Sequence, residues 1–225
     1  MMMVALYLLL TLAAMTLAGY ASPARGRTLM IALLVLAWVV GQFNTLIEAV
    51  VFSVMPLRDA LLALGVMLLV LALFAALVVT VFGKWRGEGP APVALRVTPL
   101  RLLGVVAAYI ALYFAAGTIA WPHLAHFYTP EMLPPQWLVA AVQVPRALIF
   151  VAAAWLWLRT GPRAAPLVLG FAFSVIGGIA PLFPENPYMP GDVRLVHGIE
   201  VGTSNFLFGV IVAWLIGAGR RAEVA

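Results

Sequence analysis

The sequence has no cysteine and very little charge, and both absences restrict what the chain can be. Without cysteine it can form no disulfide, hold no iron–sulfur cluster through thiolates and use no thiol nucleophile. Only 9% of its 225 residues are charged, whereas about 25% is usual in a soluble globular domain. There is too little polar surface to keep a folded chain in water.

What the chain has instead is apolar sequence along its whole length. Hydrophobic residues make up 65% of the total, and the mean hydropathy is +1.10. Because no polar region is left over, we expect a single integral membrane domain over 1–225 with the lipid bilayer as its surroundings. The net charge is +5, but the basic residues fall in short loops, so topology explains them and no nucleic-acid partner is predicted.

Seven apolar runs are each long enough to cross a hydrocarbon core of about 30 Å. They predict an all-α, polytopic membrane bundle of seven transmembrane helices. The first run lacks the basic start of a signal peptide, so it is interpreted as a helix that is not cleaved. The predicted helices cover approximately residues 4–20, 28–55, 60–83, 102–121, 137–158, 166–183 and 195–217.

The distribution of Lys and Arg predicts the orientation of the bundle. The connections on the predicted external side of the membrane carry only Arg58 and Arg194, and Arg146 lies within a helix. Since cytoplasmic loops hold the excess of basic residues, we expect an external N-terminus and a cytoplasmic C-terminus in a cell membrane, such as a bacterial inner membrane. Ten basic residues fall on the predicted cytoplasmic side: Arg25, Arg27, Lys84, Arg86, Arg96, Arg101, Arg159, Arg163, Arg220 and Arg221.

Three ionisable residues lie inside predicted membrane helices, namely Glu48, Arg146 and Glu200. Each costs about 2.5 to 3.5 kcal/mol to insert at a helix centre, so each needs a partner or a function. Counted from the helix ends, all three lie roughly 9 to 14 Å below the external surface. We therefore expect three separate helices to place ionisable side chains at the same depth in the membrane.

Other polar residues extend this cluster along two of the helices. In the last helix His197, Glu200 and Ser204 fall on one face, and in the second helix Asn44 and Glu48 are four residues apart. Glycines beside Asn205 would let a neighbouring helix approach closely, which points the polar face into the bundle. The candidate ligand-binding or proton-handling site, open to the external side, comprises Asn44, Glu48, Arg146, His197, Glu200, Ser204 and Asn205.

A metal site is a weaker interpretation of the same residues. His197, Glu200 and Glu48 could supply nitrogen and oxygen ligands to a divalent ion. Two ligands three residues apart on a helix are a weak signal, however, and Arg146 would repel a cation. The sequence therefore predicts no metal site here, and any cofactor remains open.

The external loop offers a second, weaker set of ligands. His123 and His126 are three residues apart and could join Glu131 around a metal, although exposed loop histidines are more often solvated. Haem ligation by His126 and His197 has no specific support in the sequence. Neither set amounts to a recognisable motif.

Two families with seven membrane helices fail on their essential residues. The topology resembles the microbial rhodopsins, but these need a lysine in the last helix and the sole lysine here, Lys84, lies in a loop. The membrane zinc hydrolases of the ceramidase and progestin-receptor type use Ser, Asp and three His within their helices. This chain has no Asp in the membrane interior and one His there.

Three functions remain after these exclusions. The first is binding or transport of a small or lipid-like ligand, or of a proton, at the external polar site. The second is an enzyme that modifies outer-leaflet lipids, with Glu200 or Glu48 as general base and His197 as acid or metal ligand. The third is a structural or assembly subunit with a membrane-protein partner. We favour ligand handling because the cluster has more ionisable members than fixing helix register needs.

Overall fold

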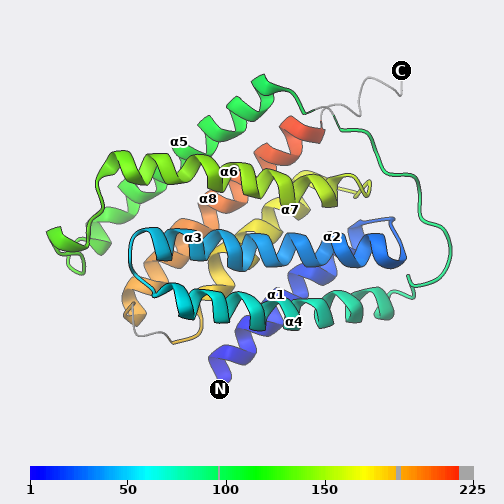
Figure 1. Cartoon of the computed structure of the whole chain (residues 1–225), viewed down its shortest axis with the longest axis horizontal. Coiled ribbons are helices and arrows are strands. Elements are labelled where there is room, and N and C mark those ends of the chain that lie inside the picture. The colour runs from blue at the N-terminus through cyan, green and yellow to red at the C-terminus, as the bar shows by residue number, and fades with distance from the viewer. Residues whose placement is uncertain (96, 186–188, 218–225) are drawn as a thin grey trace.

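A computed structural model describes residues 1–95, 97–185 and 189–217 of the chain (Figure 1). Within these residues there is no β-strand, and seven helical spans are long and apolar enough to cross a membrane. The prediction of an all-α bundle with seven membrane helices is therefore confirmed. Three basic residues used in the orientation argument, Arg96, Arg220 and Arg221, lie outside the described residues.

Two of the seven spans are composite, because a π-helical turn interrupts each of them. The second span joins α2, η1 and α3, and the sixth joins α7, η3 and η4; η2 is a single turn before α6. The bounds are α1 (Met2–Ala21), α2 (Gly26–Trp38), η1 (Val39–Phe43), α3 (Asn44–Val51), α4 (Leu57–Val81), α5 (Pro99–Leu124), η2 (Pro130–Met132), α6 (Gln136–Leu158), α7 (Ala165–Ser174), η3 (Val175–Ile179), η4 (Ala180–Leu182) and α8 (Gly191–Gly217).

The predicted boundaries differ most at two ends that lie near the same side of the bundle. The second span ends at Val51 rather than at residue 55, and shortly afterwards Ser53 has a left-handed φ of 58° that reverses the chain. The last helix begins at Gly191 rather than at residue 195. Its first turn contains Asp192, whose negative charge stabilises the helix N-terminus.

The three connections α1–α2, α4–α5 and α6–α7 meet at one end of the bundle, on the right in Figure 1. The Gly26 amide donates to the Lys84 carbonyl over 2.7 Å, and the Arg163 amide donates to the Ala21 carbonyl over 2.9 Å. The Lys84 ammonium donates to the Gly19 carbonyl over 2.8 Å, and its partial burial, followed by repulsion from Arg25, lowers its pKa. We call this the basic end; its described basic residues are Arg25, Arg27, Lys84, Arg86, Arg101, Arg159 and Arg163.

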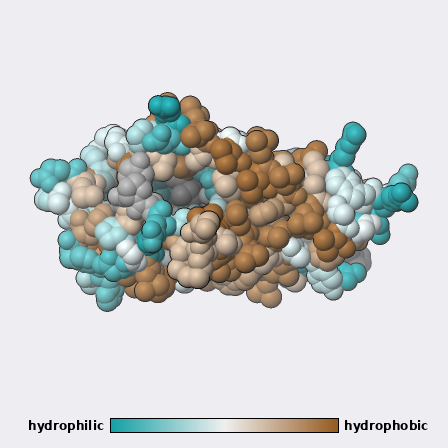
Figure 2. All heavy atoms as spheres, turned by 90° about the horizontal axis from the view of Figure 1, so that it is seen from below, coloured by the Kyte–Doolittle hydropathy of each residue, from teal (hydrophilic) through white to brown (hydrophobic). Residues whose placement is uncertain are grey.

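Apolar side chains cover the outside of the bundle as well as its core. Figure 2 shows hydrophobic residues across the middle of one face and hydrophilic ones toward its two ends. Leu69 and Leu73 of α4 and Ile119 of α5 are each about 70% or more exposed. This pattern fits helices whose outer faces contact lipid.

The π-helical turns η1 and η3 pack directly against each other. A Cβ atom on Gly41 would lie 2.8 Å from Ile176 Cγ2, and one on Gly177 would lie 2.8 Å from Val40 Cγ1, so neither position has room for a side chain. π-Helical turns are frequent at functional sites. Here η1 immediately precedes Asn44, so the irregular backbone borders the predicted polar cluster.

Candidate functional site

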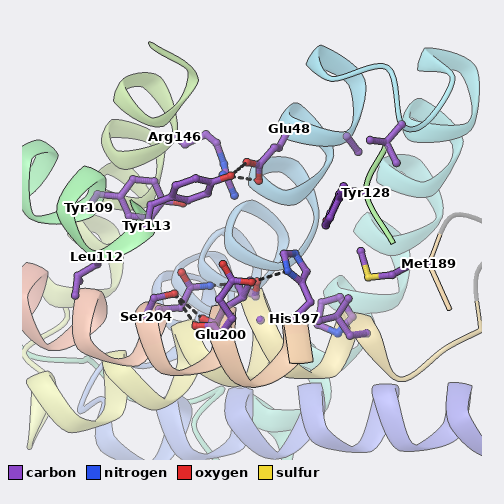
Figure 3. A pocket seen from close by; sticks show the side chains of 18 residues that line it. Glu48, Tyr109, Leu112, Tyr113, Tyr128, Arg146, Met189, His197, Glu200 and Ser204 are labelled. Atoms are coloured by element: carbon purple, nitrogen blue, oxygen red, sulfur yellow. Dashed lines mark hydrogen bonds and ion pairs between the residues drawn. The ribbon is translucent and has the colours of Figure 1, made fainter. Parts of the chain in front are cut away.

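A polar chamber of about 270 Å³ lies between α3, α5, α6, η3 and α8 (Figure 3). Its size is near the lower limit for small-molecule sites in proteins. At the end away from the basic end it reaches Val54, Tyr128 and Met189, which lie in or next to interhelical loops. Burial raises the pKa of Tyr128, and the nearby carboxylates of Glu200 and Glu48 raise it further, so its phenol stays protonated.

Arg146 is the centre of a hydrogen-bonded cluster on one wall of this chamber. Its Nη1 atom lies 2.6 Å from Glu48 Oε2, an ion pair that joins α6 to α3. The same nitrogen donates to Gln143 Oε1 over 2.7 Å, and Nε donates to Asn44 Oδ1 over 3.1 Å. The guanidinium also lies 5.8 Å from the ring centroid of Tyr109. We call Asn44, Glu48, Tyr113, Gln143 and Arg146 the Arg146 cluster.

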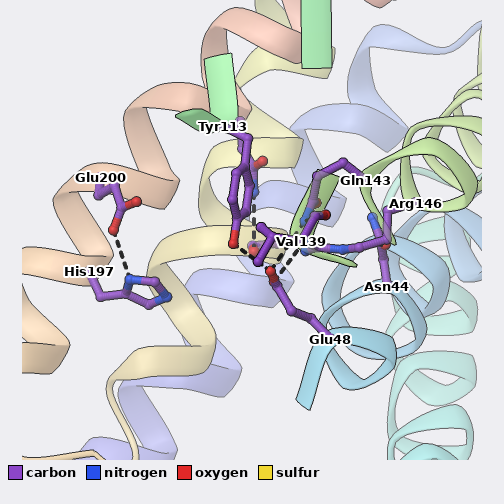
Figure 4. Close-up of polar contacts among 10 residues, drawn as sticks. Asn44, Glu48, Tyr113, Val139, Gln143, Arg146, His197 and Glu200 are labelled. Carbon is purple, nitrogen blue, oxygen red and sulfur yellow. Dashed lines mark hydrogen bonds and ion pairs between the residues drawn. The ribbon is translucent and has the colours of Figure 1, made fainter. Parts of the chain in front are cut away.

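The second carboxylate oxygen of Glu48 has partners of its own. The Tyr113 hydroxyl donates to Glu48 Oε1 over 2.6 Å, and Gln143 Nε2 lies 3.4 Å from the same oxygen (Figure 4). The side chain of Arg146 is 9% exposed and that of Glu48 is 24% exposed. Three membrane helices, α3, α5 and α6, are thus linked through one carboxylate.

His197 and Glu200 form a separate pair on the opposite wall (Figure 4). His197 Nδ1 lies 2.8 Å from Glu200 Oε2, three residues further along α8. An imidazole whose Nδ1–H donates to a carboxylate keeps Nε2 as a proton acceptor. Both residues line the chamber, and among the described residues no hydrogen bond or ion pair joins them to Glu48 or Arg146.

Ser204 and Asn205 lie one turn deeper on α8. The Ser204 hydroxyl donates to the Glu200 carbonyl over 2.9 Å, and Asn205 Nδ2 donates to the Gly177 carbonyl over 3.2 Å. The Asn205 bond satisfies a backbone oxygen within η3, where the π-helical turn disturbs the regular pattern. Asn205 therefore stabilises the chamber wall, while Ser204 adds a small polar group to it.

Four aromatic rings pack together on the side of the chamber toward the basic end, and one of them, Tyr109, lines the chamber. Tyr109, Phe150, Phe173 and Phe208 come from α5, α6, α7 and α8, and their ring centroids lie 4.5 to 6.0 Å apart. Tyr109, Phe150 and Phe208 each lie about one helical turn closer to the basic end than Tyr113, Arg146 and Ser204 of the same spans. These packed rings therefore lie between the chamber and the basic end.

All of the predicted site residues except Asn44 line the chamber. Glu48, Arg146 and Glu200 all line the chamber, as expected from their shared depth. Asn44 is bonded to Arg146 but lies behind it and does not line the chamber. The chamber is also lined by His197, Ser204 and Asn205.

Sequence reasoning missed Tyr113 and Gln143, which complete the Arg146 cluster, and Tyr109 and Tyr128, which line the chamber. Gln143 could have been found, since it precedes Arg146 by three residues and shares its helix face. Tyr113 carried a weaker signal, because it is one of three hydroxyl-bearing residues in its span, with Tyr109 and Thr118. Tyrosines are common at membrane boundaries, so their position alone indicates no site.

The metal interpretations gain no geometric support. Among the described residues no group of three His, Asp or Glu side chains lies close enough to hold a metal ion. Glu48 bonds Arg146 instead of joining His197 and Glu200. In the loop, His126 Nε2 lies 3.2 Å from Asp192 rather than beside Glu131, and both partners are well exposed.

Comparisons with known proteins add no further constraint on this site. No protein-family model, curated protein or solved structure matches the chain. The geometry of the chamber therefore carries the functional argument alone.

Proposed function

We propose that this chain binds the polar part of a small or lipid-like ligand in the chamber formed by α3, α5, α6, η3 and α8. The observation that carries the proposal is the open hydrogen-bonding capacity of a membrane-embedded cavity. Arg146 Nη2 has no hydrogen-bond partner among the described residues, and His197 Nε2 is likewise left open. Ionisable groups inside a bilayer are costly to insert, so an open donor and an open acceptor at one cavity mark a candidate ligand site.

The orientation that accompanies this proposal places the basic end in the cytoplasm and the chamber mouth outside. Its support is that seven of the nine described Lys and Arg outside the chamber lie at the basic end, while the mouth lies at the other end with Arg58 and Arg194. The packed aromatic rings on the basic side of the chamber favour binding over passive conduction. Transport across the membrane would need the rings of Phe150, Phe173 and Phe208 to separate.

The proposal is tested with single cysteines, because the natural chain has none. In intact cells Ser204→Cys should react with a small water-soluble methanethiosulfonate reagent added outside. Ser174→Cys is the matched control, because Ser174 is buried in α7 and does not line the chamber. Glu88→Cys, in the α4–α5 connection at the basic end, should react only after the cells are opened.

A bound ligand should also shield the new thiol. We expect Ser204→Cys to react at least about tenfold faster after detergent extraction and extensive washing than in native membranes. Failure of Ser204→Cys to react under any condition, or equal reaction of Ser174→Cys, would contradict an accessible binding chamber. Reaction of Glu88→Cys in intact cells would overturn the orientation alone.

A second candidate, an outer-leaflet lipid-modifying enzyme, is favoured by one observation. His197 Nδ1 is held by Glu200 Oε2 at 2.8 Å, an arrangement in which Nε2 can take a proton from a substrate hydroxyl. Ser204 is not a nucleophile in this arrangement, since its hydroxyl donates to backbone carbonyls. An enzyme would convert members of a defined lipid panel that a binding protein returns unchanged.

A further inference from the structure

The chamber has a neighbour on the lipid-facing side of the bundle. An apolar groove of about 530 Å³ runs between α5 and α8, and its sides include Ala115, Ile119, Ile199 and Leu207. Ile119 is 77% exposed and Ile199 is 64% exposed, so both side chains would face hydrocarbon in a membrane. Only 11% of the most apolar window of α5 is buried within the bundle.

The groove and the chamber share a wall. Leu112, Glu200 and Ser204 line both cavities, so the carboxylate side of α8 separates polar space from apolar space. Next to this wall α5 has Gly117, where a Cβ atom would lie 3.6 Å from Glu200 Oε1. Small residues on α5 therefore leave Glu200 accessible from the membrane side.

We propose that the ligand is a single-chain amphiphile with a small, neutral head that carries hydroxyl groups. This inference rests on the proposed binding function and names its ligand class. The hydrocarbon chain would lie in the α5–α8 groove, and the head would pass Glu200 and Ser204 into the chamber. A shared wall between an apolar groove and a polar cavity is the arrangement that such a molecule needs.

The charges around the chamber determine the head group. Arg146 is already paired with Glu48, and Glu200 is paired with His197, so two carboxylates face one guanidinium and one imidazole. Among the described residues that line the chamber, no surplus positive charge is present to bind a phosphate or carboxylate head. A hydroxyl group can accept from Arg146 Nη2 and donate to His197 Nε2, and it needs no counter-charge.

The size of the chamber limits the head as well. Its volume of about 270 Å³ fits a group such as glycerol and excludes an extended oligosaccharide. The groove has space for one hydrocarbon chain along α5 and α8. A monoacylglycerol is therefore a suitable probe for the experiment.

The inference is tested by photolabelling the purified chain in lipid nanodiscs with a monoacylglycerol that carries a diazirine in its chain. We expect labels in the α5 and α8 peptides around Ile119 and Ile199. Labelling there should exceed that on the exposed α4 residues Leu69 and Leu73 by at least about tenfold. Unlabelled monooleoylglycerol should abolish the difference at lower concentrations than oleate.

Ala115→Trp should fill the groove and remove the selective labelling. Ala115 is an exposed groove residue, so the larger side chain does not disturb the core. Ala111→Trp, one turn away on α5 and outside the groove, is the matched control and should label like wild type. If either variant fails to fold, the competition between monooleoylglycerol and oleate still decides the result.

The outcomes separate this inference from the function on which it rests. If α5 and α8 are labelled no more strongly than α4, the proposal that an amphiphile binds in the α5–α8 groove is wrong. If oleate competes with the label as well as monooleoylglycerol does, the proposal that the head group is neutral is wrong. In both cases the proposed binding function would still hold if the Ser204→Cys thiol is accessible in washed protein and shielded in native membranes.

Discussion

Two ion pairs border the same chamber, but they are built differently. Arg146 and Glu48 are 98 residues apart and join two helices, with side chains 9% and 24% exposed. His197 and Glu200 are three residues apart on α8, with side chains 32% and 13% exposed. The first pair is surrounded by Asn44, Tyr113 and Gln143, whereas among the described residues the side chains of the second pair hydrogen-bond only to each other.

The difference indicates which pair stabilises the fold and which is available for a ligand. A buried pair between helices fixes how they pack, and removing one partner leaves a charge without compensation. The His197–Glu200 pair joins no two helices, because both members belong to α8 and both line the chamber. We therefore assign the Arg146 cluster to helix packing as well as to the chamber wall, and the His197–Glu200 pair mainly to ligand contact.

The largest effect is expected for Arg146→Met. This change leaves the Glu48 carboxylate without its ion-pair partner inside the bundle, so the free energy of unfolding should fall by about 3 to 5 kcal/mol. Denaturant titration in one fixed detergent measures this change in the free energy of unfolding. The double variant Arg146→Met, Glu48→Met should be more stable than the single one, because it removes the stranded charge as well.

The matched control for this change is Arg58→Met, because Arg58 is exposed near the start of α4. Its effect on the free energy of unfolding should stay within about 0.5 kcal/mol. If Arg146→Met were no worse than Arg58→Met, the Arg146 cluster would not stabilise the fold, and the contrast between the two pairs would disappear.

An intermediate effect is expected for Tyr113→Phe. This change deletes the 2.6 Å hydrogen bond to Glu48 Oε1 and keeps the ring in place. Loss of a hydrogen bond to a charged group costs about 1.5 to 3 kcal/mol, measurable by the same titration. Tyr20→Phe, at an exposed position near the basic end, should have almost no effect. Equal effects for both variants would mean that Tyr113 does not support Glu48.

The number of helices was predictable because the membrane requires it. Each span must be long and apolar enough to cross the hydrocarbon, so seven runs of sequence predict seven helices. The gathering of Glu48, Arg146 and Glu200 followed from their depth, which the rise per residue of a helix determines. These predictions rest on dimensions that every membrane helix shares.

Partner choice within the cluster could not be predicted, because it depends on how the helices rotate and pack. The sequence left Arg146 free to pair with either Glu48 or Glu200, and the structure places it against Glu48. The π-helical turns η1 and η3 shift the faces of their spans through close contacts at Gly41 and Gly177. Such interruptions depend on the neighbouring helix and leave no periodic signal in the sequence.

The same packing explains why the α5–α8 groove was not predicted. Ala115 and Ile119 belong to an apolar run that predicts a lipid-facing helix and nothing more. A groove forms only where the partner helix presents residues such as Ile199 and Leu207 at a suitable distance. Helix association in membranes is driven by side-chain packing, which sequence spacing describes only in part.

The smallest change in stability is expected for Glu200→Gln and His197→Gln. Both side chains border the chamber, and glutamine keeps a hydrogen-bonding group at each position, so the free energy of unfolding should change by less than about 1 kcal/mol. Selective photolabelling of the α5–α8 groove should nevertheless be lost. Both measurements use the nanodisc and detergent samples already required for wild type.

Ser204→Ala is a fitting control for these two variants, since it removes a neighbouring polar group whose hydroxyl is already satisfied by backbone carbonyls. It should weaken labelling less than Glu200→Gln does. A loss of stability for Glu200→Gln as large as that for Arg146→Met would show that both pairs stabilise packing. The chamber would then fit a structural or assembly subunit better than a ligand-binding protein, because buried pairs that only fix register need no ligand.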